Sequence, residues 1–273
     1  EKGIVEAGVI FENENNVKNL RENLEENEVE CRAVPLFFIH NPRSVDKDRF
    51  DRLYESGLIG GIKLHPVYDN FKISYDTLEE VLKLSKEYTS LPILMHLDDR
   101  KKTMHLTSPE RLDMLVEQMI ENDTIVPIIL GHSGAYAHPR LVTYSEGRNP
   151  PVESYWKYFS SNEPVQYSRL YLIKHALQLA LEYPFIYLDT STCLNKIKAK
   201  IMADAINSYP ALADKVILGT DFPVKSQYKT KVYCYQEFHV GATINGQLNA
   251  LWNQGLKEEY LRKIAKKRIE DIS

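Results

Sequence analysis

The sequence predicts an α/β protein built as a (β/α)₈ barrel, and three observations lead to this prediction. Short apolar runs alternate with longer amphipathic runs along all 273 residues. The short runs lack the polar alternation of half-exposed strands, as expected for a parallel sheet buried on both faces. Most successive runs begin about 30 residues apart, the length of one strand-plus-helix unit. The 43% hydrophobic and 26% charged residues indicate a globular protein with a sizeable core, and they exclude disordered and disulfide-scaffold classes.

Seven segments are expected to be strands: 5–10, 31–39, 61–65, 92–96, 125–131, 185–189 and 216–219. Their starts lie 26, 30, 31, 33, 60 and 31 residues apart, so one interval has double length. We expect a single barrel domain over residues 1–273, with a long loop insertion at about 133–168 in that interval. This aromatic-rich segment is either a lid over the catalytic face or a packed excursion or subunit contact. A closed barrel has eight strands, and the sequence shows seven.

Helices are predicted between the strands. Ser108 is expected to be an N-cap, with Pro109 at the first helical position. Asp76 and Glu79 resemble a capping box at the start of another helix. A weaker apolar stripe consists of Ile197, Ile201 and Ala205. No glycine-rich nucleotide loop follows any predicted strand, which favours the barrel over an open doubly wound sheet.

Charge and composition also limit the partners. With 34 basic and 38 acidic residues the net charge is -4, so we expect no nucleic-acid partner. The apolar runs are far shorter than the roughly 20 residues that cross a bilayer, so we expect no membrane partner. Cys31, Cys193 and Cys234 form no C-x-x-C pair and no signal-peptide pattern opens the chain, which together predict a cytoplasmic protein.

Polar residues end five of the predicted strands. They are Lys63 and His65, His96, His132, Asp189 and Asp221. Because the catalytic face of a barrel lies at the carboxyl ends of its strands, these tips are expected to converge. Imidazole and carboxylate suit zinc, with manganese as the alternative, and such a metal activates water near neutral pH. No cysteine ends a strand and no G-x-S-x-G motif occurs, which argues against thiolate and serine-hydrolase sites.

The motifs GIKLHP (61–66), PILMH (92–96), GHSG (131–134), LDTS (188–191) and GTDFP (219–223) resemble the amidohydrolase superfamily. The nearest branch is amidohydrolase-2, which includes aminocarboxymuconate-semialdehyde decarboxylase and related hydrolases and lactonases. The resemblance runs in order over nearly the whole chain. It implies a TIM-barrel, metal-dependent enzyme with a small-molecule substrate, and it suggests a homodimer.

The resemblance also implies roles for individual residues. His96 would be a metal ligand, and Asp221 a ligand that also moves the proton of the metal-activated water. His132 would polarise the substrate or act as acid or base. Lys63 and His65 share one face of their strand and would contact an anionic group of the substrate, with a carboxylated, metal-bridging Lys63 as the alternative.

Two further residues of these motifs have open roles. Asp189 and Ser191 would be either hydrogen-bonding supports or participants in the reaction. The histidines outside the motifs are expected to be structural or surface residues, with His40 as the one other candidate at a strand end.

One element of the family pattern is missing. The family's first strand carries H-x-H, which supplies two metal ligands, and this sequence contains no H-x-H. Either a segment before Glu1 carries it or the protein has lost its metal site, and we expect the former. The leading hypothesis is hydrolysis of an ester, lactone or amide carbonyl in a small anionic substrate. The alternatives are a non-oxidative decarboxylase of the same family and a non-catalytic barrel.

Overall fold

The computed structural model describes residues 5–26, 31–97, 103–134, 169–191, 193, 196–219, 244–267 and 272. Strands and helices alternate along the chain: β1 (Val5–Phe11), α1 (Glu14–Glu26), β2 (Cys31–Phe38), α2 (Lys47–Glu55), β3 (Gly61–Leu64), α3 (Tyr75–Glu87), β4 (Ile93–Met95), η1 (Met104–Leu106), α4 (Pro109–Glu121), β5 (Ile128–Leu130), η2 (Gly131–Gly134), α6 (Arg169–Glu182), β6 (Ile186–Asp189), α7 (Lys196–Ser208), η4 (Pro210–Asp214), β7 (Val216–Ile217), α9 (Ile244–Asn253) and α10 (Glu258–Lys266). All seven predicted strands are confirmed, each with ends within a few residues of the expected ones.

The seven strands belong to one sheet, in which they are ordered as they occur in the chain. The registered pairs β1–β2, β2–β3, β3–β4 and β6–β7 are all parallel. Chain order without a reversal is typical of barrel topology, because doubly wound sheets reverse their strand order at a switch point. The order therefore supports the predicted barrel over the open sheet.

The chain divides into two compact units. The described residues up to His96, together with His105–Ile129, make up unit 1, and those between 130 and 267 lie in unit 2. The expectation of a single domain stays a prediction. So does the expected insertion, because residues 135–168 lie outside the described part of the chain.

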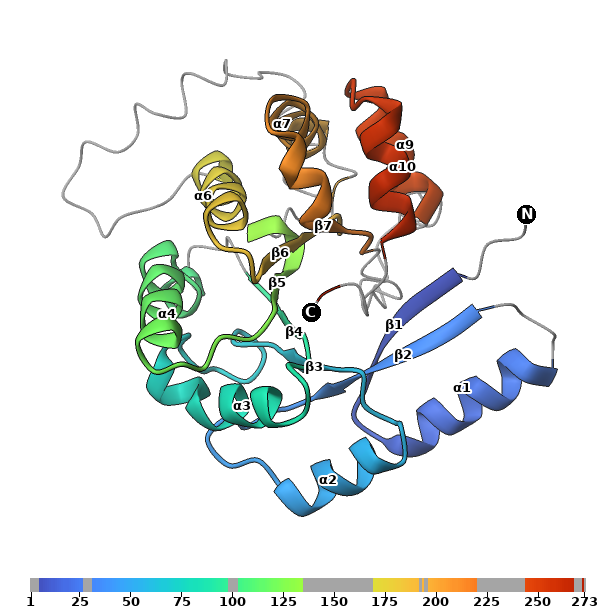
Figure 1. Cartoon of the computed structure of the whole chain (residues 1–273), viewed down its shortest axis with the longest axis vertical. Coiled ribbons are helices and arrows are strands. Elements are labelled where there is room, and N and C mark those ends of the chain that lie inside the picture. The colour runs from blue at the N-terminus through green and yellow to red at the C-terminus, as the bar shows by residue number, and fades with distance from the viewer. Residues whose placement is uncertain are drawn as a thin grey trace, which may run out of the picture. The chain divides into compact units, whose positions relative to one another are not determined.

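Unit 1 contains β1 to β4 with helices α1 to α4. In Figure 1, β1 and β2 run side by side, with α1 next to them. Phe50 of α2 is fully buried, and its ring lies 6.1 Å from that of Phe37 and 5.4 Å from that of Tyr88. The interior consists of side chains from both faces of short strands and from the inner faces of the helices, as the uninterrupted apolar runs predict.

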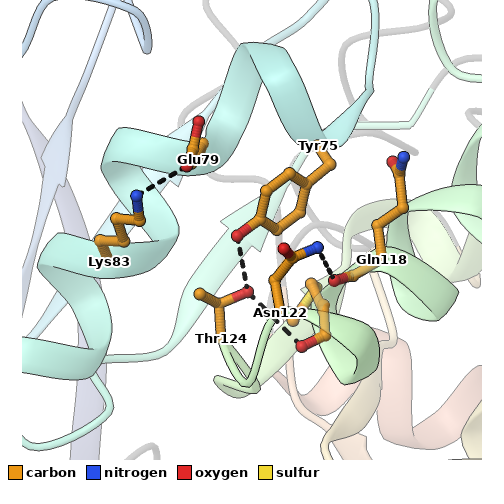
Figure 2. Close-up of polar contacts among 7 residues, drawn as sticks. Tyr75, Glu79, Lys83, Gln118, Asn122 and Thr124 are labelled. Atoms are coloured by element: carbon orange, nitrogen blue, oxygen red, sulfur yellow. Dashed lines mark hydrogen bonds and ion pairs between the residues drawn. The ribbon is translucent and has the colours of Figure 1, made fainter.

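Helices α3 and α4 are joined by polar contacts at their ends (Figure 2). The hydroxyl of Thr124, just after α4, lies 3.4 Å from the phenolic oxygen of Tyr75 at the start of α3. The Asn122 side chain donates to the carbonyl of Gln118, an exposed carbonyl in the last turn of α4. The contact of Thr124 with Tyr75 links the end of one helix to the start of the other, whereas the contact of Asn122 stays within the end of α4.

The predicted cap at Ser108 is confirmed in position, with Pro109 at the first position of α4, although the serine side chain makes no capping hydrogen bond. The predicted capping box at Asp76 is wrong. Helix α3 begins at Tyr75, and Ser74 is its N-cap. The hydroxyl of Ser74 bonds that of Thr77 at 2.9 Å, so the Asp76–Glu79 spacing matched the motif without being the helix start.

Unit 2 contains η2, α6, β6, α7, η4, β7, α9 and α10. On α7 the buried side chains include Lys198, Ala199, Met202, Ala203 and Ile206. The predicted stripe is therefore displaced by about one position, since Ile201 and Ala205 are only half-buried. No described helix has the length and hydrophobicity that a membrane-spanning segment needs.

Candidate functional site

In unit 1, three nitrogen-bearing side chains gather at the carboxyl ends of β3 and β4. Lys63 is buried on β3, and His65 follows two residues later on the same face. His96 directly follows β4, and its backbone N–H donates to the carbonyl of Leu64 at 3.0 Å, which continues the strand pairing. As a result the rings of His65 and His96 stack, with centroids 3.8 Å apart and planes 14° from parallel.

The stacking limits what the two histidines can do together. A metal ion binds a ring nitrogen in the plane of the imidazole, at about 2.0–2.1 Å. An ion bound to both of these nearly parallel rings would lie far out of at least one ring plane. His65 and His96 therefore do not serve as joint ligands of one ion in this arrangement, and their individual roles stay predictions.

The tautomer of His65 follows from a backbone contact. The N–H of Tyr68 donates to Nδ1 of His65 at 3.0 Å, so Nδ1 carries the lone pair. The proton of the neutral ring is then on Nε2, which makes this nitrogen a donor. A donor on the same strand face as the buried Lys63 suits a negatively charged oxygen better than a metal ion.

In unit 2, His132 lies in the turn η2 that follows β5. His132 has φ 57° and ψ 24°, and Ser133 has φ 44° and ψ 45°, so two successive non-glycine residues occupy the left-handed region. His132 is 3% exposed, and its backbone N–H donates to Oδ1 of Asp189 at 2.7 Å. Strained backbone of this kind persists only where surrounding contacts hold it, and such positions concentrate at functional sites.

Asp189 at the end of β6 organises the surroundings of that turn. Its Oδ1 also accepts the hydroxyl of Ser191 at 2.7 Å, and the same hydroxyl oxygen lies 2.8 Å from Nδ1 of His132. Gly219 allows the close approach of Asp189, because a Cβ on this glycine would lie 3.1 Å from the carboxylate. The GTDFP motif therefore contributes a small residue to the support of the LDTS motif.

A buried lysine from α7 completes this network. Lys198 is 1% exposed, and its ammonium donates to the backbone carbonyl of His132 and, at 2.8 Å, to that of Ser191. Lys198 was not among the residues predicted from the sequence, because only an apolar stripe was expected on this helix. The signal that could have found it is a lysine placed next to Ala199 and four residues before Met202, two apolar residues that are fully buried on this helix.

The metal ligand set is described only in part. Of the two predicted ligands, His96 is 7% exposed in unit 1, whereas Asp221 lies outside the described residues. Within the described part of the chain, no group of three His, Cys, Asp or Glu side chains is arranged to hold a metal ion. The predicted convergence of all five strand tips stays a prediction, because Lys63, His65 and His96 belong to unit 1 and His132 and Asp189 to unit 2.

No protein-family model and no curated protein matches the sequence, but solved structures match its fold. A candidate amidohydrolase from Staphylococcus aureus is 14% identical, with a TM-score of 0.50 over 92% of this chain and 76% of the other. A candidate 2-pyrone-4,6-dicarboxylic acid hydrolase from Pseudomonas putida is 11% identical, with a TM-score of 0.54 over 95% and 93%. The chain shares the barrel fold of these two structures. This confirms the predicted (β/α)₈ architecture, with seven strands described, and the resemblance at the level of the fold.

A third structure is a carboxyvanillate decarboxylase from Novosphingobium aromaticivorans with bound manganese. It is 10% identical, with a TM-score of 0.49 over 94% of this chain and 69% of the other. The fold assignment rests on the first two structures.

A second polar cluster in unit 1 consists of Glu12, His40 and Asp69, of which only His40 was a candidate from the sequence. The Nδ1 atom of His40, after β2, lies 2.8 Å from a carboxylate oxygen of Asp69, and its Nε2 lies 3.5 Å from Glu12, which follows β1. His40 and Glu12 are exposed, whereas the Asp69 side chain is only 9% exposed. The position of Glu12 and His40 directly after strands was the signal that could have drawn attention to them.

Cys193 is the one cysteine whose side chain is described, and the expectation that no thiolate takes part stays a prediction. Cys193 is fully buried, and this burial raises the pKa of its thiol to about 12. At neutral pH it is a neutral thiol whose sulfur contacts that of Met202 at 3.1 Å. Such a group behaves as a small apolar side chain and not as a nucleophile or ligand.

Proposed function

We propose that the protein is a metal-dependent hydrolase that opens an ester, lactone or amide carbonyl of a small anionic substrate. The observation that carries this proposal is the group of residues at the ends of β3 and β4, where a buried lysine shares a strand face with one of two stacked histidines. The fold it shares with a candidate hydrolase of a cyclic dicarboxylic ester supports the same substrate class. The proposal covers a reaction type and a charge, not a named substrate.

Lys63 and His65 bind the anionic group of the substrate in this proposal. A carboxylate gains one charged contact from the Lys63 ammonium and one hydrogen bond from Nε2–H of His65, whose tautomer is set by the Tyr68 N–H. Charge-assisted hydrogen bonds of this kind are short and directional, especially where water is excluded. The two residues would orient the substrate, and neither needs to change protonation during the reaction.

His96 and Asp221 are the proposed metal ligands, with zinc as the first candidate and manganese as the second. A buried neutral imidazole fits a ligand of either metal, and its position after β4 corresponds to a strand-end site. The metal supplies an activated water near neutral pH and an electrophile for the carbonyl oxygen. Asp221 would accept the proton from the attacking water, and His132 would move a proton or polarise the carbonyl.

The test begins with metal binding by the purified chain. We expect Zn²⁺ to bind in a calorimetric titration, and His96→Ala to weaken binding at least about 10-fold, in line with losses seen at metal sites. His105→Ala is the matched control, because His105 is exposed and lies only nine residues further on. Equal Zn²⁺ affinity in both variants would overturn the assignment of His96.

Turnover tests the reaction type. A panel of lactones and esters with and without a carboxylate, assayed with added Zn²⁺ or Mn²⁺, is expected to show hydrolysis of the carboxylate-bearing members. Lys63→Met should raise KM for these more than for neutral analogues, because it removes the cationic contact. Release of CO₂ from unsaturated or aromatic acids without hydrolysis would replace hydrolysis by decarboxylation, and no turnover at all would leave a non-catalytic barrel.

A further inference from the structure

Three buried residues of unit 2 form a continuous chain of hydrogen bonds. Oδ1 of Asp189 contacts the hydroxyl of Ser191 at 2.7 Å, and this hydroxyl contacts Nδ1 of His132 at 2.8 Å. All three residues are buried, with Ser191 only 1% exposed. The order of the chain is Asp189, Ser191, His132.

The donors along this chain can be assigned from the backbone. Oδ1 of Asp189 already accepts the backbone N–H of His132 at 2.7 Å and that of Ser191 at 3.2 Å, so this oxygen is an acceptor. Two oxygens 2.7 Å apart need a proton between them, and here only Ser191 can supply it. A hydroxyl has a single proton, so the Ser191 oxygen must act as acceptor toward His132.

The ring of His132 therefore donates from Nδ1. When the ring is neutral its one proton lies on Nδ1, and its lone pair lies on Nε2. A neutral His132 in this tautomer accepts a proton at Nε2. It cannot donate a hydrogen bond from Nε2 to a carbonyl oxygen unless it is first protonated.

We propose that Ser191 is a positioning residue that holds neutral His132 as the Nδ1–H tautomer and so makes it a proton acceptor at Nε2. This inference rests on the proposed function, in which His132 either moves a proton or polarises the carbonyl, and it selects the first role. Ser191 acts through His132 and does not contact the substrate.

The surrounding contacts keep this geometry fixed. The Lys198 ammonium donates to the backbone carbonyls of both His132 and Ser191, which ties the η2 turn to the segment after β6. The hydroxyl of Ser133 donates to the backbone carbonyl of Asp189. The left-handed backbone of His132 and Ser133 is thereby held from two sides, and the imidazole is presented to Ser191 in one orientation.

The same three residue types form the catalytic triad of serine hydrolases, but the connectivity here is different. In that triad the histidine lies between serine and aspartate and removes the proton of the serine. Here the serine lies in the middle, its hydroxyl donates a hydrogen bond to the aspartate, and it is almost inaccessible to solvent. Ser191 is therefore not a nucleophile, and a fluorophosphonate probe should not label it.

The test reads the tautomer directly. Nitrogen-15 NMR of histidine-labelled protein distinguishes a protonated ring nitrogen from one with a lone pair, and His132→Gln identifies the signals of His132 among the 8 histidines. In the wild-type protein we expect a proton on Nδ1 and a lone pair on Nε2. A lone pair on Nδ1 of the neutral ring would overturn the proposal, whatever the activity.

Variants then test whether Ser191 sets this state. Ser191→Ala is expected to lose the single tautomer and give a mixture or a shift toward Nε2–H, and Ser191→Thr, which keeps the hydroxyl, should restore it. Ser85→Ala is the control, since it removes a buried hydroxyl of α3 that bonds a backbone carbonyl, that of Leu91, and not an imidazole. An unchanged tautomer in folded Ser191→Ala would overturn the proposal.

Kinetics separate this inference from the proposed function. With a substrate found in the panel, Ser191→Ala should lower kcat about 10–100-fold at nearly constant KM, as for residues that orient a catalytic group through a hydrogen bond. The expected tautomer in a protein without any turnover would support the positioning role of Ser191 and defeat the hydrolase assignment. Turnover with the opposite tautomer would do the reverse. Labelling of Ser191 by the fluorophosphonate would also overturn the inference.

Discussion

Gly134 ends the turn that carries His132, and replacing it with alanine should destabilise unit 2 strongly. Its φ is +86°, and a Cβ at this position would lie 2.7 Å from the backbone carbonyl oxygen of Leu172 and 2.8 Å from Cβ of Ala176. Both atoms belong to α6, which packs against the turn. The substitution therefore combines an unfavourable backbone conformation with a steric clash against the backbone of a helix.

The two contributions can be separated by a control in the same unit. Gly255 also has a φ of +86°, but nothing lies within 4 Å of a Cβ built on it. Gly255→Ala should cost only the left-handed conformation, about 1–2 kcal/mol. Gly134→Ala should cost the same plus about 1–3 kcal/mol for overpacking, because a backbone carbonyl cannot move aside as a flexible side chain does.

The assay is urea unfolding of both variants, followed by circular dichroism and by hydrogen exchange of peptides from unit 2. With an m-value of about 2 kcal/mol/M, an extra 2 kcal/mol lowers the unfolding midpoint by about 1 M. Hydrogen exchange shows whether the loss extends to α6, the element that has to move. If the two variants unfold at the same urea concentration, the close packing of Gly134 against α6 is wrong.

Three further substitutions or modifications follow from buried groups. Lys198→Met should lower the free energy of unfolding in urea by about 1–3 kcal/mol, because two buried carbonyls lose their donor. Lys200 lies exposed on the same helix, and Lys200→Met should change the free energy of unfolding by less than about 0.5 kcal/mol. Phe50→Ala should lower the free energy of unfolding by about 3–5 kcal/mol in thermal or urea unfolding, whereas Met114→Ala, at an exposed residue, should change it little. A small loss of stability in Phe50→Ala would contradict the central place of Phe50 in the core. Cys193 should resist iodoacetamide at pH 8 until urea unfolds the chain, as mass spectrometry of its peptide would show. Burial raises the pKa of the Cys193 thiol from 9.0 to about 12, so on raising the pH the unfolded chain loses this proton before the folded chain does. The contribution of the buried thiol to folding stability is therefore present below pH 9 and is lost as the pH rises toward 12.

The strands were predictable because one physical signal dominates them. Ile62 and Leu64 are fully buried, and so is Leu188 of β6. A strand covered on both faces leaves a continuous apolar run, which a single sequence reveals without any knowledge of its neighbours. The same logic located the polar residues at the strand ends, since Lys63 and His65 interrupt or end such a run.

The helical details were less predictable because a helix buries only part of its surface. On α7 the apolar residues are spread widely enough that either of two adjacent stripes fits the sequence. The choice between them depends on what the helix packs against, and at Lys198 it depends on two carbonyls contributed by residues 132 and 191. Such partners are distant in the sequence and leave no periodic signal.

The roles of Asp189, Ser191 and His132 likewise depend on contacts that the sequence does not reveal. The LDTS and GHSG motifs show Asp, Ser and His in the sequence. For Asp189 and Ser191 these motifs left two roles open, hydrogen-bonding support or participation in the reaction. What distinguishes the two is the direction of the hydrogen bonds that Ser191 makes with Asp189 and with His132, which lies 59 positions away in the sequence. That direction is fixed by backbone N–H groups, which every residue except proline has and no motif records. Because Oδ1 of Asp189 is already an acceptor, the serine must donate to it, the histidine must donate to the serine, and Nε2 of His132 becomes the basic atom. In the role proposed for His132, main-chain geometry thus determines which ring nitrogen is basic, and residue types alone do not contain that information.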